Sequence, residues 1–148
     1  MTTIQTYTLN LILLECLEGQ EYDGDEPYLK LNGDLIWRWD LAGKKMHDTL
    51  NAPSWTNAFD LRNGMFRTLA GWAPSPHYQA GQFEFKGLSG KTVLELWESD
   101  EHESPRGEDD FLGSLTVTLE SIRMGDQIVE FNQNDALYQL IYRVSLDV

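Results

Sequence analysis

Carboxylate side chains gather in two short stretches that lie far apart in the sequence. Residues 15–26 contain six acidic residues and no basic one, and residues 98–110 contain seven acidic residues and one arginine. The rest of the chain, with eleven acidic and ten basic residues, is nearly neutral, although the whole chain carries −13. Carboxylates that converge without a counterion repel one another and raise one another's pKa values. A divalent cation removes this repulsion because it binds several carboxylate oxygens at once. The pattern therefore indicates a cation site, provided that the fold brings both stretches together.

Other side chains offer little for catalysis. His47, His77 and His102 are scattered, and no H-E-x-x-H motif is present. Cys16 ends an apolar stretch, where a core position is more typical than a nucleophile. We therefore expect no enzymatic activity. Because paired carboxylates are also the catalytic groups of glycosidases, a hydrolytic or carbohydrate-binding β-sandwich remains a lower-ranked alternative.

Charge and composition narrow the class of protein. Nucleic-acid binding needs a basic footprint, which this acidic chain lacks. No apolar run reaches the roughly 18 residues of a membrane-spanning helix, and the first residues do not form a signal peptide. The single cysteine favours a reducing compartment, so we expect a cytoplasmic protein. An EF-hand is excluded. In a calcium loop that starts at Asp23, Pro27 and Tyr28 would occupy positions five and six, where an oxygen ligand and a glycine are required.

The chain reads as many short strands. Residues 138–148 alternate between apolar and polar side chains with one departure, Ile141, and a similar pattern begins at Tyr7. A short helix is expected at Gly64–Leu69. The 148 residues fit one all-β domain, 1–148, an antiparallel sandwich with little helix. The predicted strands are Tyr7–Leu13, Tyr28–Leu31, Leu35–Trp39, Phe83–Lys86, Thr92–Glu98, Ser114–Leu119, Ile128–Phe131 and Tyr138–Val148.

The acidic stretches fall in gaps between these predicted strands. The first fills the gap between Cys16 and Tyr28, and the second follows the strand that ends at Glu98. Loops of an antiparallel sandwich cluster at its two ends. Both stretches at the same end would bring their carboxylates together.

Three motifs in this order resemble the C2 domain, the calcium- and phospholipid-binding β-sandwich. They are DGDEPYLKL (Asp23–Leu31), LNAPSWTNAFDL (Leu50–Leu61), and GLSGKTVLELWESDE followed by EDDFLGSLTVTL. The resemblance covers nearly the whole chain. It implies an eight-stranded antiparallel sandwich with calcium held between loops at one end, and the strand order resembles the circularly permuted, type II form.

The resemblance also implies a set of calcium ligands. Asp23 and Glu26 match the acidic positions of the first loop, and Glu98, Asp100 and Asp110 match those of the third. Asp25 and Asp109 are additional candidates. Glutamate stands at two of the five positions where the family usually has aspartate, the first loop is short, and the third loop carries the insertion ESPRGE.

Two functions follow from the resemblance. The first is a non-enzymatic calcium-binding domain that interacts with a protein partner or a phospholipid membrane when calcium is bound. The alternative is a calcium-independent interaction module that uses a sheet face, with Trp37 and Trp39 as candidates. These two residues share one face of a predicted strand, although such pairs more often pack a core or cover a sheet.

Overall fold

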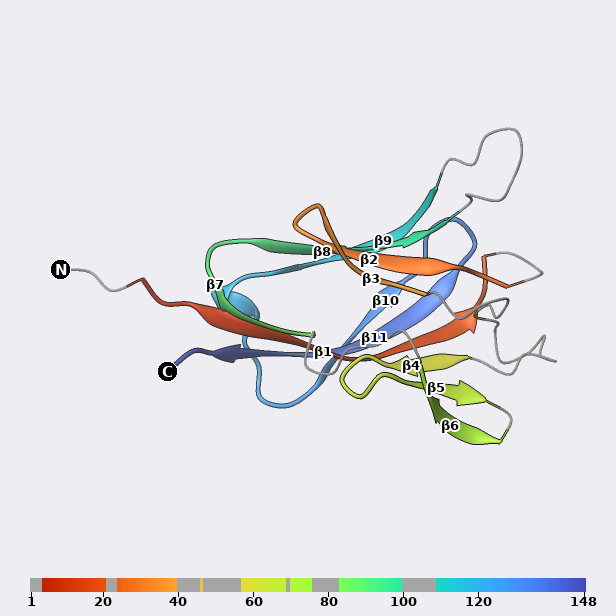
Figure 1. The fold of residues 1–148 in the computed structure, drawn as a ribbon. Helices are drawn as coiled ribbons and strands as arrows, with labels where there is room; N and C mark the ends of the chain where they lie inside the picture. The colour runs from red at the N-terminus through yellow and green to blue at the C-terminus, as the bar shows by residue number, and fades with distance from the viewer. Residues whose placement is uncertain are drawn as a thin grey trace.

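Two antiparallel β-sheets pack face to face in the computed structural model of the chain (Figure 1). The structure describes residues 4–20, 24–39, 46, 57–68, 70–75, 83–99 and 109–148. These residues form eleven strands and one short 3-10 helix, so the predicted all-β sandwich with little helix is confirmed. The strands are β1 (Tyr7–Glu18), β2 (Pro27–Leu31), β3 (Asp34–Arg38), β4 (Ala58–Asp60), β5 (Met65–Thr68), β6 (Gly71–Pro74), β7 (Glu84–Leu88), β8 (Thr92–Glu98), β9 (Asp110–Val117), β10 (Gln127–Phe131) and β11 (Leu137–Leu146), and η1 spans Leu119–Ser121.

The larger sheet is built around β1. This strand pairs with β11 along one side and with β7 and then β4 along the other. The sheet continues from β11 to β10 at one edge and from β4 through β5 to β6 at the other. The smaller sheet has the order β3-β2-β8-β9. β1 begins and β11 ends at one end of the sandwich, and β8 ends and β9 begins at the other (Figure 1).

A continuous apolar core fills the space between the sheets. Alternating residues of β1, β8 and β11 point into it, as the period of two predicts. The buried Tyr7 connects the sheets, because its hydroxyl lies 2.7 Å from Thr92 Oγ1 and donates toward the carbonyl oxygens of Gly90 (2.9 Å) and Val117 (3.1 Å). A core hydroxyl with this many partners holds β1 in register against β8 and β9.

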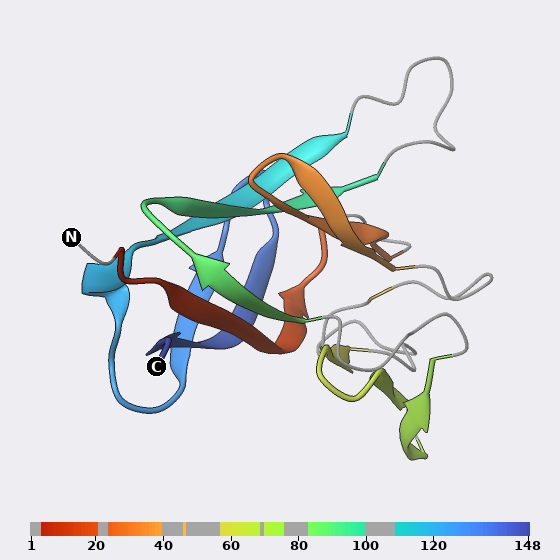
Figure 2. The same cartoon turned by 60° about the vertical axis from the view of Figure 1, so that its left-hand side comes forward.

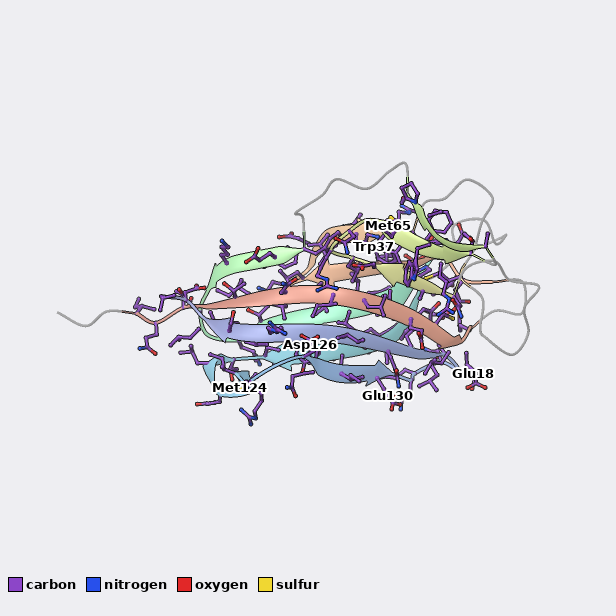
Figure 3. The ribbon with its side chains drawn as sticks, turned by 90° about the horizontal axis from the view of Figure 1, so that it is seen from below. Glu18, Trp37, Met65, Met124, Asp126 and Glu130 are labelled. Atoms are coloured by element: carbon purple, nitrogen blue, oxygen red, sulfur yellow. The ribbon has the colours of Figure 1, made fainter. Side chains whose placement is uncertain are left out.

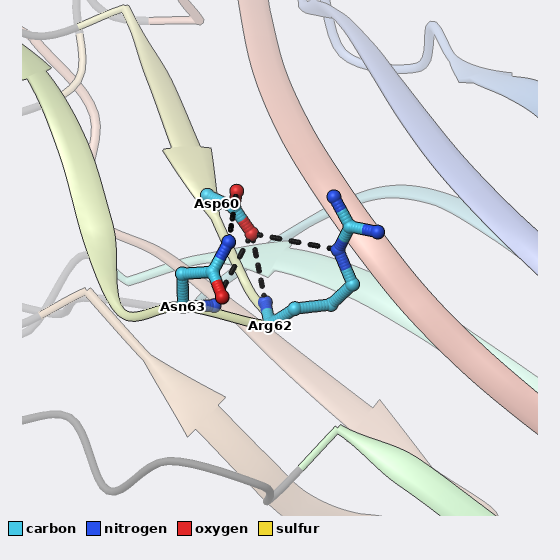
Figure 4. Close-up of polar contacts among 3 residues, drawn as sticks. All are labelled: Asp60, Arg62 and Asn63. Carbon is cyan, nitrogen blue, oxygen red and sulfur yellow. Dashed lines mark hydrogen bonds and ion pairs between the residues drawn. The ribbon is translucent and has the colours of Figure 1, made fainter.

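All eight predicted strands are present, but the short helix expected at Gly64–Leu69 is wrong. Met65–Thr68 is strand β5, which forms a hairpin with β6 at the edge of the larger sheet (Figure 2). The turn before it explains the difference. The Asp60 carboxylate accepts hydrogen bonds from the backbone N–H groups of Arg62 and Asn63 and from the Asn63 side chain (Figure 4). Gly64, at φ 65°, donates its N–H to the Asp60 carbonyl, so the chain reverses here and β5 pairs antiparallel with β4.

Hydrogen bonds to Asp147 connect the last residues of the chain to the start of β1 and to β7. Its carboxylate accepts hydrogen bonds from the hydroxyls of Thr6 (2.6 Å) and Thr8 (2.5 Å) and from the N–H of Gly87 (3.0 Å). The two threonine hydrogen bonds are the main cause that lowers the pKa of Asp147 below its ordinary value. These contacts close the larger sheet at the end where β1 begins and β11 ends.

We expect Asp147→Asn to lower the melting temperature at pH 7. The folded pKa is lowered, so this stabilisation is present above the ordinary aspartate pKa and is lost as the pH falls through the folded value. Thermal unfolding at pH 7 and pH 3 should therefore show a difference from the wild type that shrinks in acid. Asp34→Asn, at the exposed start of β3, is the control. A difference that stays constant over this range would contradict the assignment.

Candidate functional site

The strand register brings the ends of both acidic stretches to the same end of the smaller sheet. Glu98, the last residue of β8, pairs with Asp110, the first residue of β9. Glu98 also pairs with Pro27, the first residue of β2, directly after Asp25 and Glu26. This end of the sandwich lies opposite the start of β1 and the end of β11 (Figure 1). The expectation that the two stretches meet therefore agrees with the placement of their described residues.

Gln20 connects the two acidic stretches directly. Its backbone N–H donates a hydrogen bond to Asp25 Oδ2 (2.7 Å), within the first stretch. Its side-chain Nε2 donates to Asp110 Oδ2 (2.6 Å), in the second. Both bonds go to carboxylates and are therefore stronger than bonds between neutral groups. Gln20 follows the end of β1, and no motif marks it in the sequence.

Asp25 lies in the protein interior rather than on a solvated loop. Its exposed fraction is 0%, and its Oδ2 accepts a second hydrogen bond from the hydroxyl of Tyr138 (2.6 Å), on β11. Its backbone pairs with Met46 through two hydrogen bonds of 2.8 and 2.9 Å. Burial, followed by the neighbouring Cys16 and Asp25 side chains, raises the pKa of Tyr138 well above its ordinary value. The hydroxyl therefore remains a proton donor to Asp25 at neutral pH.

The other described acidic residues also contact protein donors. Glu98 is 0% exposed, and its Oε1 accepts a hydrogen bond from the backbone N–H of Glu26 (3.2 Å). The Asp109 Oδ2 accepts one from the hydroxyl of Tyr28 (2.5 Å). Glu26 itself is partly exposed just before β2. Protein hydrogen bonds thus offset part of the repulsion among these carboxylates.

Aromatic side chains support this end of the smaller sheet on its outer face. Trp97 and Phe111 are cross-strand partners on β8 and β9, with ring centroids 5.2 Å apart. The ammonium group of Lys30 lies 5.4 Å from the Trp97 ring centroid, which is within the range of a cation–π contact. Trp97, next to the acidic stretch, therefore packs as a structural residue of the smaller sheet.

The oxygen atoms at this site are suitable ligands for a hard cation, but the described residues supply only part of a complete ligand set. Gln20 Oε1 is a buried amide oxygen with no hydrogen-bond partner among them, and the same residue donates hydrogen bonds to the carboxylates of Asp25 and Asp110. Calcium prefers six to eight such oxygens. However, no three His, Cys, Asp or Glu side chains are grouped closely enough to hold a metal in the part of the chain that the structure describes. Asp23 and Asp100 lie outside the described residues.

The tryptophan pair considered as an interaction surface is part of the core. Trp37 and Trp39 are 8% and 4% exposed, and both rings pack against Phe59 at centroid distances of 5.3 Å. The two tryptophans therefore pack in the core. They do not form an exposed docking face. Phe59 lies on β4, a strand that was not predicted, so the sequence did not show what would cover the pair.

Within the described residues, no helix is long and apolar enough to cross a membrane. No protein-family model matches the chain, and no curated protein matches its sequence. Among solved structures that resemble it, a C2 domain is 13% identical over 97% of this chain and 99% of that chain, with a TM-score of 0.44. The Drosophila C2-DSL-EGF1 structure is 10% identical over 97% of this chain and 68% of that chain, with a TM-score of 0.38. Similarity at this level neither assigns the chain to a family nor transfers a function.

Proposed function

We propose that the chain is a non-enzymatic, C2-like module that binds calcium at its acidic end and then interacts with a partner. The observation that supports this proposal is the Gln20 bridge, which links Asp25 of the first acidic stretch to Asp110 of the second. Asp110, Glu98 and the Gln20 amide oxygen would supply the described part of the oxygen set. Asp23 and Asp100, next to these residues in the sequence, would complete it.

Bound calcium would change the charge of this end from strongly negative toward neutral. The carboxylates repel one another without the ion, and the ion favours the arrangement in which they converge. A neutralised end is a better contact for an acidic protein surface or an anionic phospholipid headgroup than the calcium-free end. In this proposal the protein's residues hold and orient the cation, and no covalent chemistry takes place.

Calcium should raise the melting temperature of the protein by about 5–10 °C. At a free concentration a hundredfold above the dissociation constant, one site adds about 2.7 kcal/mol. Each kcal/mol shifts the midpoint of a domain of this size by roughly 2–4 °C. The measurement is thermal unfolding in EDTA and in millimolar calcium. Magnesium should act much less, because it requires tight octahedral geometry and retains its waters.

Variants at the acidic end test the residues involved. Asp100→Asn combined with Asp110→Asn should abolish the calcium shift. Glu84→Gln combined with Glu120→Gln removes the same charge elsewhere and should retain the shift. If millimolar calcium moves neither the melting curve nor the amide resonances of residues 98–110, the calcium proposal is wrong.

A calcium-independent interaction module is the second candidate, and one observation favours it. The carboxylates of Asp25, Asp109 and Asp110 already accept protein hydrogen bonds of 2.5–2.7 Å, so the acidic end has internal stabilisation without a cation. Partner binding that is equal in EDTA and in calcium would select this candidate.

A further inference from the structure

The outer face of the larger sheet carries a row of apolar side chains. Ile141 on β11 pairs with Leu13 on β1 and with Ile128 on β10, so the three side chains are neighbours across three strands. Ile128 is 62% exposed, and Leu13 and Ile141 are partly exposed. The residues that follow Leu13 and precede Ile141, Leu14 and Leu140, are fully buried on the opposite face. We call Leu13, Ile141 and Ile128 the apolar row.

Two glutamates that have no cationic partner among the described residues border one side of the apolar row. In the next row of the sheet, Gln139 pairs with both Glu15 and Glu130. Neither glutamate makes an ion pair or a side-chain hydrogen bond with another described residue. Glu18 lies further along the same side, toward the end of β1 (Figure 3).

The opposite side of the apolar row is electrostatically balanced. The guanidinium group of Arg143 contacts Asp126 Oδ1 through Nη2 (2.8 Å) and Nε (3.0 Å). The face is therefore asymmetric, with an ion pair on one side of the row and uncompensated glutamates on the other. Figure 3 shows Asp126 and Glu130 on this face, with Glu130 nearer to Glu18.

This asymmetry determines which kind of partner fits. Anionic lipid and nucleic acid would be repelled by the glutamates, and the chain's own net charge of −13 disfavours a second copy. A segment with apolar side chains over the row and Lys or Arg beside it would bury the exposed isoleucine and neutralise the glutamates. Neighbouring rows lie about 7 Å apart along a strand, so an amphipathic helix, about 10–12 Å wide with its side chains, covers the apolar row and reaches the glutamates beside it.

We propose that the apolar row, with Glu15 and Glu130, is a docking surface for a basic amphipathic segment of another protein. The surface is separate from the proposed calcium ligands and needs no cation. Charge complementarity supplies orientation, because the basic side chains must lie on the glutamate side of the row. Burial of the Ile128 side chain against the partner supplies the apolar part of the binding free energy.

The test uses the full chain, labelled with nitrogen-15, in excess EDTA. The probe is a synthetic Leu–Lys peptide with its leucines on one helix face, and the comparison peptide has Glu in place of Lys. The Leu–Lys peptide should shift amide resonances of β10, β11 and the second half of β1, with an affinity that falls as salt is added. The Leu–Glu peptide should leave them unchanged.

Matched variants identify the surface. Ile128→Ser, and Glu15→Gln combined with Glu130→Gln, should each weaken the Leu–Lys peptide about tenfold. Glu84→Gln combined with Glu120→Gln, which removes the same charge elsewhere, should change the affinity less than about twofold. Melting curves confirm that each variant is folded.

Four results would overturn the proposal. Amide shifts confined to residues 98–110 would place the peptide on the acidic end instead. Equal binding of the Leu–Glu peptide, or an equal loss in the control variant, would show that the glutamates do not recognise the partner. Sedimentation of the unliganded chain as a dimer that Ile128→Ser dissociates would make a second copy the occupant.

Discussion

Tyr138→Phe should lower the free energy of unfolding by about 2–3 kcal/mol, because Asp25 remains buried and loses a hydrogen-bond donor. Hydrogen bonds to charged groups contribute roughly 1.5–3 kcal/mol, and this bond joins two side chains that are both 0% exposed. Chemical denaturation at pH 7 measures the change. Tyr142→Phe is the matched control on the same strand, since that hydroxyl makes no hydrogen bond with any described residue. An equal effect of both substitutions would contradict the role assigned to the Tyr138–Asp25 contact.

The same tyrosine predicts a loss of stability in alkali. Its pKa is raised in the folded protein, so above the ordinary tyrosine pKa of about 10 the unfolded chain releases the proton first. The free energy of unfolding therefore falls as the pH rises from that value toward the folded pKa. Tyr138→Phe removes this group, and its stability should fall less steeply between pH 9 and pH 11. Parallel curves for the two proteins would show that Tyr138 does not contribute.

Gly113→Ala is expected to destabilise the fold by about 2–4 kcal/mol. A Cβ atom on Gly113 would lie 2.8 Å from Phe131 Cδ1 and 3.0 Å from Phe131 Cα, where β9 crosses close to β10. Overpacking costs about 1–3 kcal/mol, and the positive φ of 153° adds backbone strain. Because Asp110 begins the same strand, the substitution should also disturb the acidic end.

Gly125→Ala separates the two causes of that effect. Gly125 also has a positive φ, 83°, but a Cβ atom there would have no heavy atom within 4 Å. Its substitution should cost only about 1–2 kcal/mol from backbone strain. Thermal or denaturant unfolding of both variants provides the comparison. A loss at Gly113 no greater than that at Gly125 would refute the close approach of β9 to β10.

Local patterns in the sequence were sufficient for most of the architecture. The alternation in residues 138–148 and the apolar run that starts at Tyr7 predicted the two strands that form the centre of the larger sheet. Side-chain alternation is a property of each strand by itself, so it can be read without knowing the strand's partners. The hairpin of β5 and β6 was missed because its strands are only four residues long and because the turn at Asp60, which pairs β5 with β4, was not anticipated.

The sequence by itself determined eight of the strands in the described residues and the location of the two acidic stretches, because periodicity and charge are properties of neighbouring residues. Only the tertiary structure decided which acidic residues are buried and which groups contact them. The Gln20–Asp110 bond joins residues 90 positions apart, and the Tyr138–Asp25 bond joins residues 113 positions apart. No local pattern encodes such pairs, since they exist only after the sheets have packed and the strand register has brought their ends together.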